Sequence, residues 1–227
     1  MIPTTRWNFP KPDGNAEMAL REDLGIEPLT SRILVNRGIV DTNQAKKFFN
    51  PVLADLHNPF LMVDMKKGVD RVVEALYRNE PIAVYGDYDA DGITSTVCLV
   101  KFLKEIHPRV SYYIPHRLSE GYGLNQEAVD HIRSRGTRLI ITVDCGITDH
   151  DAIAYARSKG VDTVILDHHK VPDSLPRAAA VINPQRSDCP FPFKYMAAVG
   201  IVFNFLIALR GTLRTAGFWT GRPYPNL

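Results

Sequence analysis

From Pro81 onward, short apolar runs alternate with segments of helical periodicity, and this alternation limits the fold more than any other feature of the sequence. The apolar runs are PIAVY, SYYIP, RLIITV, DTVIL and AAAVI, and the first four are separated by ITSTVCLVKFLKEI, NQEAVDHIRSRG and DHDAIAYARSKG. Strands that are apolar throughout, joined by crossover helices, are typical of a parallel sheet covered on both faces. We therefore predict an α/β fold, doubly wound around a mostly parallel five-stranded sheet.

Residues 1–75 have a different character, with helix-like segments at Asn15 to Asp23 and Thr42 to Phe49 that are separated by Pro and Gly. Thr42 is a candidate N-cap for the second segment, because its hydroxyl can accept an early backbone N–H. We expect a small helical region over residues 1–75 and the α/β domain over residues 76–227. Near the end, MAAVGIVFNFLIALR is strongly apolar but interrupted by glycine, which favours a core helix over a membrane span.

The composition, with 45% hydrophobic and 23% charged residues over 227 positions, is that of a soluble globular protein with a substantial core. No stretch reaches the roughly 18 uncharged apolar residues of a membrane span, and the amino terminus lacks the order of a signal peptide. We therefore expect a cytoplasmic protein with no membrane partner. A net charge of +2 permits a nucleic-acid partner without indicating one. Cys98, Cys145 and Cys189 follow no CxxC pattern, so we expect reduced, mostly buried thiols.

Polar residues follow the predicted strands at the point where each strand ends. PIAVY is followed by GDYDADG, SYYIP by HR, RLIITV by DCG, DTVIL by DHH, and AAAVI by NPQ. In open α/β sheets, ligands bind beyond the carboxyl ends of the strands, and a parallel sheet brings these ends to one edge. We call the residues that directly follow a strand its exit. Because Asp and His bind divalent cations, the Asp and His residues at these exits together predict a metal site.

Asp87, Asp89 and Asp91 alternate across the first exit and are followed by Gly92. Three carboxylates this close repel one another unless cations neutralise them. The spacing also matches the opening of an EF-hand loop, but the twelfth position is Cys98 instead of Glu, and a strand precedes the motif. A solvated acidic turn is the remaining alternative, and the other strand exits argue against it.

Asp144 directly follows RLIITV, and Asp167, His168 and His169 directly follow DTVIL. Taken alone, an aspartate such as Asp144 is more often a cap or turn residue than a metal ligand. The Asp and His residues that follow the other strands make the metal-ligand role of Asp144 the favoured one. Adjacent side chains at a strand end point in different directions, so we expect one histidine to bind metal and the other to approach a substrate phosphate.

These residues stand in segments that resemble the DHH phosphoesterase superfamily in the form used by the RecJ family. DYDADG, DCG and DHH look like its first three motifs, and IPHRLSEGYGLN, ITVDCGI and INP look like RecJ segments in RecJ order. LHNPFLMVDM resembles the lead into the family's catalytic domain. The resemblance covers nearly the whole chain and implies that residues 76–227 are a DHH phosphoesterase domain.

The resemblance also implies roles for individual residues. It implies a two-ion site, filled by Mn²⁺ or Mg²⁺, formed by Asp87, Asp89, Asp91, Asp144 and His168. His169 would lie near the scissile phosphate, so that the catalytic residues are His168, His169 and Asp144. Substrate binding falls to His169 and to residues of the PHRLSEGYG and INP segments, namely Arg117, Gly121, Tyr122, Gly123 and Asn183. Arg117 can pair with a phosphate, and Asn183 is either a supporting or a turn residue.

The activity implied is metal-dependent 5'-to-3' hydrolysis of single-stranded DNA to 5'-mononucleotides, in DNA repair and recombination. Single-stranded DNA with a 5' end is the expected partner, joined by a single-strand-binding protein and a helicase. One alternative is a phosphodiesterase or pyrophosphatase for small substrates, although such relatives carry a His where this chain has Asp87. Another is a non-catalytic module that binds nucleic acid or replication proteins. A dinucleotide-binding fold is disfavoured because no GxGxxG follows the first strand.

The sequence departs from the family pattern in one respect. The family has a fourth motif, an Asp in a GTxAD-like segment, and nothing like it occurs before the chain stops at Pro225-Asn226-Leu227. We therefore expect a chain truncated before that motif, with one metal ligand missing and its activity weakened or lost.

Overall fold

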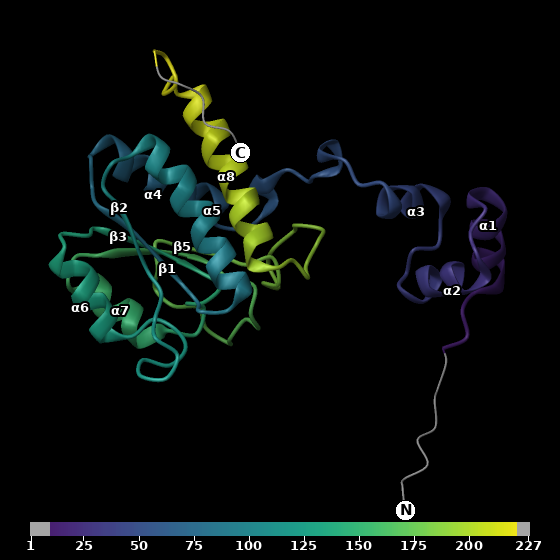
Figure 1. The fold of residues 1–227 in the computed structure, drawn as a ribbon, viewed down its shortest axis with the longest axis horizontal. Coiled ribbons are helices and arrows are strands. Elements are labelled where there is room, and N and C mark those ends of the chain that lie inside the picture. The colour runs from purple at the N-terminus through teal and green to yellow at the C-terminus, as the bar shows by residue number, and fades with distance from the viewer. Residues whose placement is uncertain (1–9, 222–227) are drawn as a thin grey trace, which may run out of the picture. The chain divides into compact units, whose positions relative to one another are not determined.

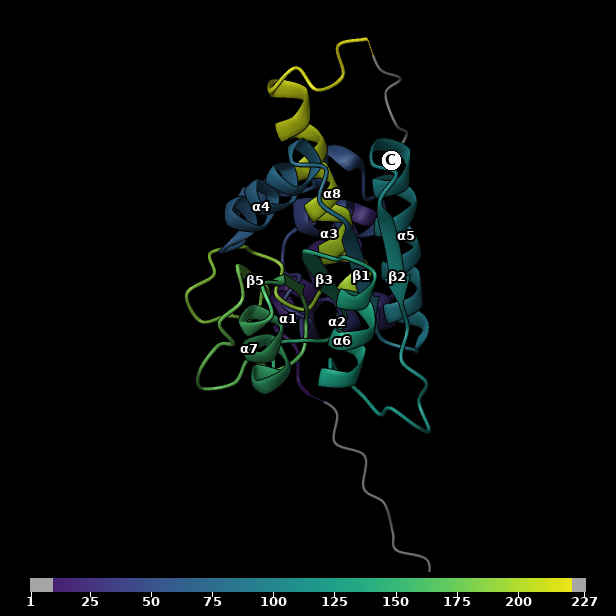
Figure 2. The ribbon, with the colours of Figure 1, turned by 90° about the vertical axis from the view of Figure 1, so that its left-hand side faces the viewer.

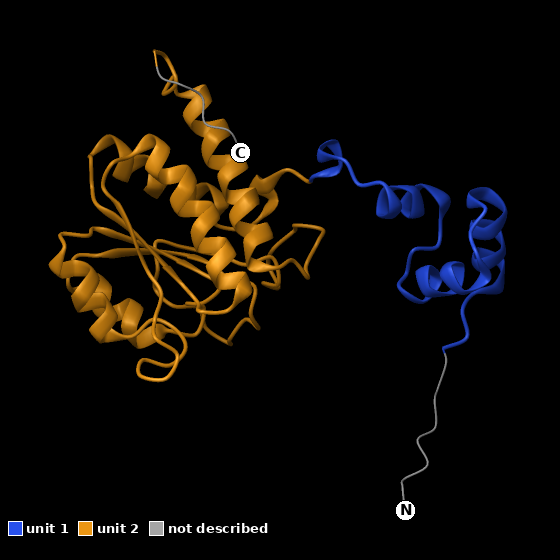
Figure 3. Ribbon diagram, viewed as in Figure 1, with its two compact units in different colours: residues 1–56 blue, residues 57–227 orange. Residues whose placement is uncertain are grey.

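The computed structural model describes residues 10–221. These residues form two compact units that divide between Leu56 and His57 (Figure 3). Most of the amino-terminal stretch in which we expect no signal peptide, and the end of the chain at Pro225 to Leu227, lie outside the described residues. The domain boundary expected after residue 75 falls inside a helix of the second unit, α4 (Met65–Tyr77). As a boundary between family domains it stays a prediction.

The first unit is helical, as expected. It contains α1 (Gly14–Leu24), α2 (Pro28–Asn36), α3 (Thr42–Phe49) and a short 3-10 helix, η1 (Leu53–Asp55). Its small core consists of Leu20, Leu34, Val35 and Ala45. The expected N-cap at Thr42 is wrong by one residue, because the Asp41 carboxylate accepts the backbone N–H groups of Asn43 and Gln44. A carboxylate caps a helix as well as a hydroxyl does, and the Thr42 hydroxyl instead donates to Asp23.

The second unit is built on a five-stranded sheet in the order β2-β1-β3-β4-β5, with every neighbouring pair parallel. The strands are β1 (Ile82–Gly86), β2 (Val110–Tyr113), β3 (Leu139–Val143), β4 (Asp162–Leu166) and β5 (Ala180–Ile182). All five predicted strands are present. The three central strands, β1, β3 and β4, are almost wholly buried, which explains why their sequences are apolar at consecutive positions.

Helices cover both faces of this sheet (Figures 1 and 2). One face carries α4, α5 (Ala90–Ile106) and α8 (Ala198–Thr215), and the other carries α6 (Gln126–Ser134) and α7 (His150–Ser158). Alternate residues of each strand enter the two cores: Ile82 and Val84 face the α5 side, whereas Ala83 and Tyr85 face the α6 side. The prediction of a doubly wound α/β fold is confirmed. The short 3-10 helix η2 (Pro59–Leu61) precedes α4.

The apolar segment predicted to be a core helix forms α8, which packs on α4 and α5. Within the described residues, α8 is the one helix long and apolar enough to cross a membrane, and 50% of its apolar window is buried. Ile201, Phe205 and Leu209 are fully buried in the larger core, which confirms the core-helix prediction. The cysteines are also as expected, since all three are free thiols and Cys145 and Cys189 are buried.

Candidate metal centre

The turn between β1 and α5 carries the first three predicted ligands. Asp87 lies at the end of β1 and is 6% exposed, and burial raises the pKa of its carboxyl group. Asp89 is the N-cap of α5, where it accepts the Gly92 N–H at 2.9 Å, and this bond holds its pKa below the ordinary value. A Cβ at Gly92 would lie 2.5 Å from the Asp87 carbonyl oxygen, so only glycine lets α5 begin this close to β1.

Asp91 lies one residue into the same helix and turns toward α8. Its carboxylate accepts the backbone N–H of Ala198 at 2.7 Å and of Val199 at 2.9 Å. One of its oxygens also lies 3.8 Å from His168 Nε2. Asp91 therefore faces the predicted metal site while it caps the amino end of another helix.

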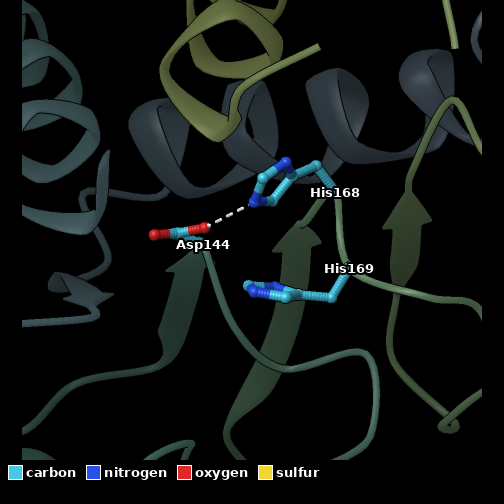
Figure 4. A group of neighbouring side chains, drawn as sticks. All are labelled: Asp144, His168 and His169. Atoms are coloured by element: carbon cyan, nitrogen blue, oxygen red, sulfur yellow. Dashed lines mark ion pairs between the residues drawn. The ribbon is translucent and has the colours of Figure 1, made fainter. Parts of the chain in front are cut away.

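Asp144 leaves β3 in the left-handed conformation, with φ 62°, and its side chain is almost completely buried. Its Oδ1 lies 3.2 Å from His168 Nε2 and is a buried atom with no hydrogen-bond partner (Figure 4). Burial and the nearby carboxylates of Asp91 and Asp89 raise the pKa of Asp144 to about 8. A buried carboxylate oxygen without a hydrogen bond is costly in the protein alone, and a cation would satisfy it.

The two histidines after β4 lie side by side on the Asp144 side, with ring centroids 4.7 Å apart (Figure 4). The prediction that their side chains point in different directions is wrong, because the chain has left the extended strand here, and the two rings differ in their hydrogen-bond partners instead. His168 Nδ1 lies 3.1 Å from the Met196 carbonyl oxygen, and its Nε2 faces Asp144. Because a carbonyl only accepts, Nδ1 carries the proton and Nε2 keeps a lone pair for a metal ion.

His169 forms a separate pair with the buried Asp167, whose Oδ1 lies 2.7 Å from His169 Nδ1. Burial alone would raise the pKa of Asp167, but hydrogen bonds from His169 and from the Ile147 N–H lower it. The Asp167 carboxylate in turn raises the pKa of His169. The sequence identified Asp167 only as part of the strand exit, and its contact with His169 shows that it orients that ring.

Tyr122, in the loop from His116 to Leu124, also lies at the carboxyl edge of the sheet. The Tyr122 hydroxyl donates to the Asp144 carbonyl oxygen at 3.2 Å and lies 3.2 Å from His169 Nδ1. Gly121 and Gly123 both have positive φ, and a Cβ at Gly123 would meet the Asp149 carboxylate at 2.7 Å. The loop therefore needs glycine on each side of Tyr122, which explains the GYG pattern.

The remaining predicted site residues lie farther from the carboxylates. The exposed Arg117 guanidinium stands over the Tyr88 ring, 5.5 Å from its centroid. Asn183 is fully buried, donates to the His169 carbonyl oxygen at 2.9 Å and accepts the Gln185 N–H. This geometry favours a supporting role for Asn183, and direct contact of either residue with a substrate stays a prediction.

Two groups of candidate ligand atoms meet at Asp144, and within each the atoms lie within 4.8 Å of one another. They are Asp144 with His168 and His169, and Asp87 with Asp89 and Asp144. Within residues 10–221, none of these carboxylates pairs with a Lys or Arg. Mostly oxygen donors with one or two imidazoles suit Mn²⁺ or Mg²⁺, so the donor set fits such ions. Asp144 is the residue that the two groups share.

A doubly wound parallel sheet with acidic and histidine side chains gathered at its carboxyl edge defines an α/β protein with a candidate metal centre. Comparison with known proteins refines this class. The model of the DHH family, N-terminal domain, matches residues 81–217, and the chain belongs to this family.

The curated relatives include single-stranded-DNA-specific exonucleases named RecJ. That of Bacillus subtilis (strain 168) is 41% identical over 208 residues, which cover 92% of this chain and 26% of the relative. That of Escherichia coli (strain K12) is 38% identical over 209 residues, covering 89% of this chain and 35% of the relative. The chain thus spans between a quarter and about a third of these relatives' length.

Solved structures give the same result. Exonuclease RecJ bound to manganese matches with a TM-score of 0.62 and 34% identity, covering 72% of this chain and 40% of that chain. RecJ from Thermus thermophilus in complex with Mn²⁺ matches with a TM-score of 0.70 and 27% identity, covering 94% of this chain and 28% of that chain. The resemblance seen in the sequence motifs is confirmed.

Proposed function

We propose that this chain carries the metal centre of a 5'-to-3' exonuclease that hydrolyses phosphodiester bonds in single-stranded DNA. The observation that carries the proposal is the convergence of Asp87, Asp89, Asp144 and His168 at one sheet edge with no Lys or Arg paired to them among the described residues. The relatives named for this activity support the choice of substrate. The proposed setting is the cytoplasm, in DNA repair and recombination.

Each residue has a defined task in this proposal. Bound divalent ions supply a water of lowered pKa and stabilise charge on the reacting phosphate. Asp87, Asp89, Asp91, Asp144 and His168 hold the ions, and the carboxylates need not take up protons. His169, oriented by Asp167 and bordered by Tyr122, lies beside the ligand group and is positioned to donate a hydrogen bond to the scissile phosphate.

Recognition of the DNA strand falls to the loop that leads to Tyr122. Arg117 is exposed and has a cationic guanidinium for a backbone phosphate. Gly121 and Gly123 have no side chain, so a DNA strand can approach the backbone of this loop closely. We further propose that a single-strand-binding protein and a helicase work with the enzyme, on the basis of the family resemblance alone.

Release of mononucleotides tests the proposal. The chain is incubated with Mn²⁺ and single-stranded DNA that carries a 5'-phosphate and a label at either end, beside a matched duplex. We expect slow release of 5'-mononucleotides, from the single strand only and from its 5' end. Asp144→Asn should abolish release, whereas Asp162→Asn, at the opposite end of the sheet, should keep it. Equal cleavage of the duplex, or activity that survives Asp144→Asn, would contradict the proposal.

A further inference from the structure

The segment from Met196 to Val199 contacts two predicted metal ligands that come from different elements. The Met196 carbonyl oxygen lies 3.1 Å from His168 Nδ1, and the Ala198 and Val199 N–H groups donate to Asp91 at 2.7 and 2.9 Å. These contacts use backbone atoms alone. The segment has no metal-binding side chain of its own apart from the Met196 thioether, so no site motif identifies it.

We propose that this segment, which we call the α8 clamp, is a positioning element that sets the affinity of the centre for divalent ions. The inference rests on the proposed function only to the extent that the site binds such an ion. Metal ligands are oriented by the hydrogen bonds that their other atoms make, and loss of one such bond weakens metal affinity by about 10-fold to 100-fold. The α8 clamp makes these bonds for Asp91 and His168 together.

The clamp fixes His168 by its tautomer and its direction. With the Nδ1 proton directed at the Met196 carbonyl oxygen, Nε2 stands 3.2 Å from Asp144 and 3.8 Å from Asp91. An imidazole held in this way presents its lone pair to the same point as the two carboxylates. The ring therefore needs no rearrangement when an ion binds, which lowers the cost of binding.

Asp91 is held by backbone N–H groups at the start of α8. The N-cap residue of α8, Ala197, makes no side-chain cap, and Asp91 satisfies two of the free N–H groups at the amino end of this helix. Each carboxylate oxygen takes one N–H and keeps another lone-pair direction for a cation. A metal ion and α8 can therefore share the same carboxylate.

Side chains farther along α8 hold the clamp in place. An ideal Cβ at Gly200 would lie 2.5 Å from Met196 Cγ and 2.9 Å from its sulfur, so the Met196 side chain lies over a helix turn that only glycine leaves open. The buried Asn204 donates to the Gly200 carbonyl oxygen at 2.9 Å and contacts the Met196 sulfur at 3.6 Å. Met196, Gly200 and Asn204 are thus positioning residues that act through the clamp backbone.

Ala198→Pro tests the Asp91 contact directly. Ala198 is the first residue of α8, a position where proline keeps the helix but removes the N–H and places its ring against the Asp91 carboxylate. The matched control is Gln126→Pro, at the first position of α6, where the N–H donates to no other described residue. Mn²⁺ is titrated into the metal-free chain, and the free ion is followed by electron paramagnetic resonance. We expect the Kd to rise by about 10-fold or more in Ala198→Pro and to stay within about twofold in the control.

A second pair of variants keeps the test decisive if Ala198→Pro does not fold. Gly200→Ala displaces Met196, whereas Gly211→Ala adds the same methyl group in the same helix where nothing lies within 4 Å. We expect about a 3-fold to 10-fold rise in the Mn²⁺ Kd for the first variant only, below the effect of losing a supporting hydrogen bond outright, because Met196 is displaced and not removed. In the metal-free chain, ¹⁵N shifts should show His168 protonated on Nδ1.

The outcomes separate this inference from the proposed function. Equal Kd values within the folded pair, or a His168 that carries its proton on Nε2 and none on Nδ1, would overturn the clamp. Wild-type chain that does not bind Mn²⁺ would overturn both proposals. Wild-type chain that binds Mn²⁺ but does not cleave DNA would count against the exonuclease alone, because the clamp is judged by Kd.

Discussion

Both the amino edge and the carboxyl edge of the sheet carry carboxylates, but only the carboxylates of the amino edge are paired with arginine among the described residues. At the amino edge, Arg71 lies 2.7 Å from Glu80 and 2.8 Å from Asp162, so the protein itself supplies a cation to these carboxylates. At the carboxyl edge, Asp87 and Asp144 have no Lys or Arg partner among residues 10–221. A structural ion pair supplies its own counter-ion, whereas a binding site leaves that place to its ligand. The predictions that follow test this contrast.

The largest expected effect is on metal affinity. Asp144 belongs to both groups of candidate ligands, so Asp144→Asn should weaken Mn²⁺ binding by about 100-fold or more, beyond the loss of a supporting hydrogen bond. Asp162→Asn removes a carboxylate from the amino edge and should change the Kd by less than about twofold. Calorimetric titration of the two variants and the wild-type chain measures the difference. Similar losses in both variants would mean that the contrast between the edges is not functional.

The pH dependence of stability is the next effect, and its sign follows from Asp144. Its pKa is raised to about 8, above the ordinary 3.8, because the charged form is buried beside other carboxylates. The folded, metal-free chain therefore keeps a proton that the unfolded chain releases. The stabilisation of the folded state by this proton is complete below about pH 4 and is lost as the pH rises through about 8.

We expect the free energy of unfolding of the metal-free chain to fall over that window by roughly half of the ~5–6 kcal/mol that four pKa units give without solvent screening. Urea unfolding at several pH values measures it. Saturating Mn²⁺ should remove most of the decline, since a metal ion binds the deprotonated carboxylate and is lost on unfolding. Asp144→Asn should also remove it, because the amide does not titrate. A decline that persists in this variant would assign the effect to other groups.

The sequence predicted the sheet, and the grouping of most candidate site residues at its carboxyl edge, for a simple physical reason. Buried strands such as Ile82–Gly86 and Leu139–Val143 must be apolar at consecutive positions, and their exits must meet at one edge. The polar residues at those exits could therefore be grouped from the order of residues alone. The two histidine rings are an exception, since they lie 4.7 Å apart where adjacent positions at a strand end predict that the side chains diverge.

The parts that the sequence did not predict depend on backbone atoms and on distant contacts. The contact of Asp91 with α8 joins residues 107 and 108 positions apart and uses N–H groups that every non-proline residue has. The Met196 carbonyl oxygen likewise has no sequence signal. Asp144 takes a left-handed conformation that favours glycine or asparagine, and the choice of Asp41 over Thr42 as a cap is a one-residue difference. Neither follows from residue type alone.

Arg71→Ala should remove the ion pairs that Arg71 makes at the amino edge of the sheet and destabilise the fold. The Arg71 side chain is 12% exposed, and its removal leaves Glu80, which is 18% exposed, with only the longer contact of 3.9 Å to Arg78 among the described residues. We expect a loss of about 2 kcal/mol in the free energy of unfolding, between the values for exposed and buried ion pairs. Urea unfolding with and without Mn²⁺ measures it, and the Mn²⁺ Kd should not change. A shift in Kd as large as the shift in stability would show that the two edges are coupled.

The smallest effect should have the opposite sign. Asp87 is 6% exposed, and burial raises the pKa of its carboxyl group, so its charge destabilises the metal-free fold. Asp87→Asn keeps the shape of the side chain and an oxygen for the Tyr88 N–H that Asp87 accepts at 2.8 Å. We expect the metal-free variant to gain about 1 kcal/mol at pH 8 and to bind Mn²⁺ more weakly. Denaturation of the two proteins without metal compares them. If Asp87→Asn destabilises the chain as Arg71→Ala does, the carboxyl edge is balanced by charges of the protein itself, and the argument from unpaired carboxylates to a metal site loses its basis.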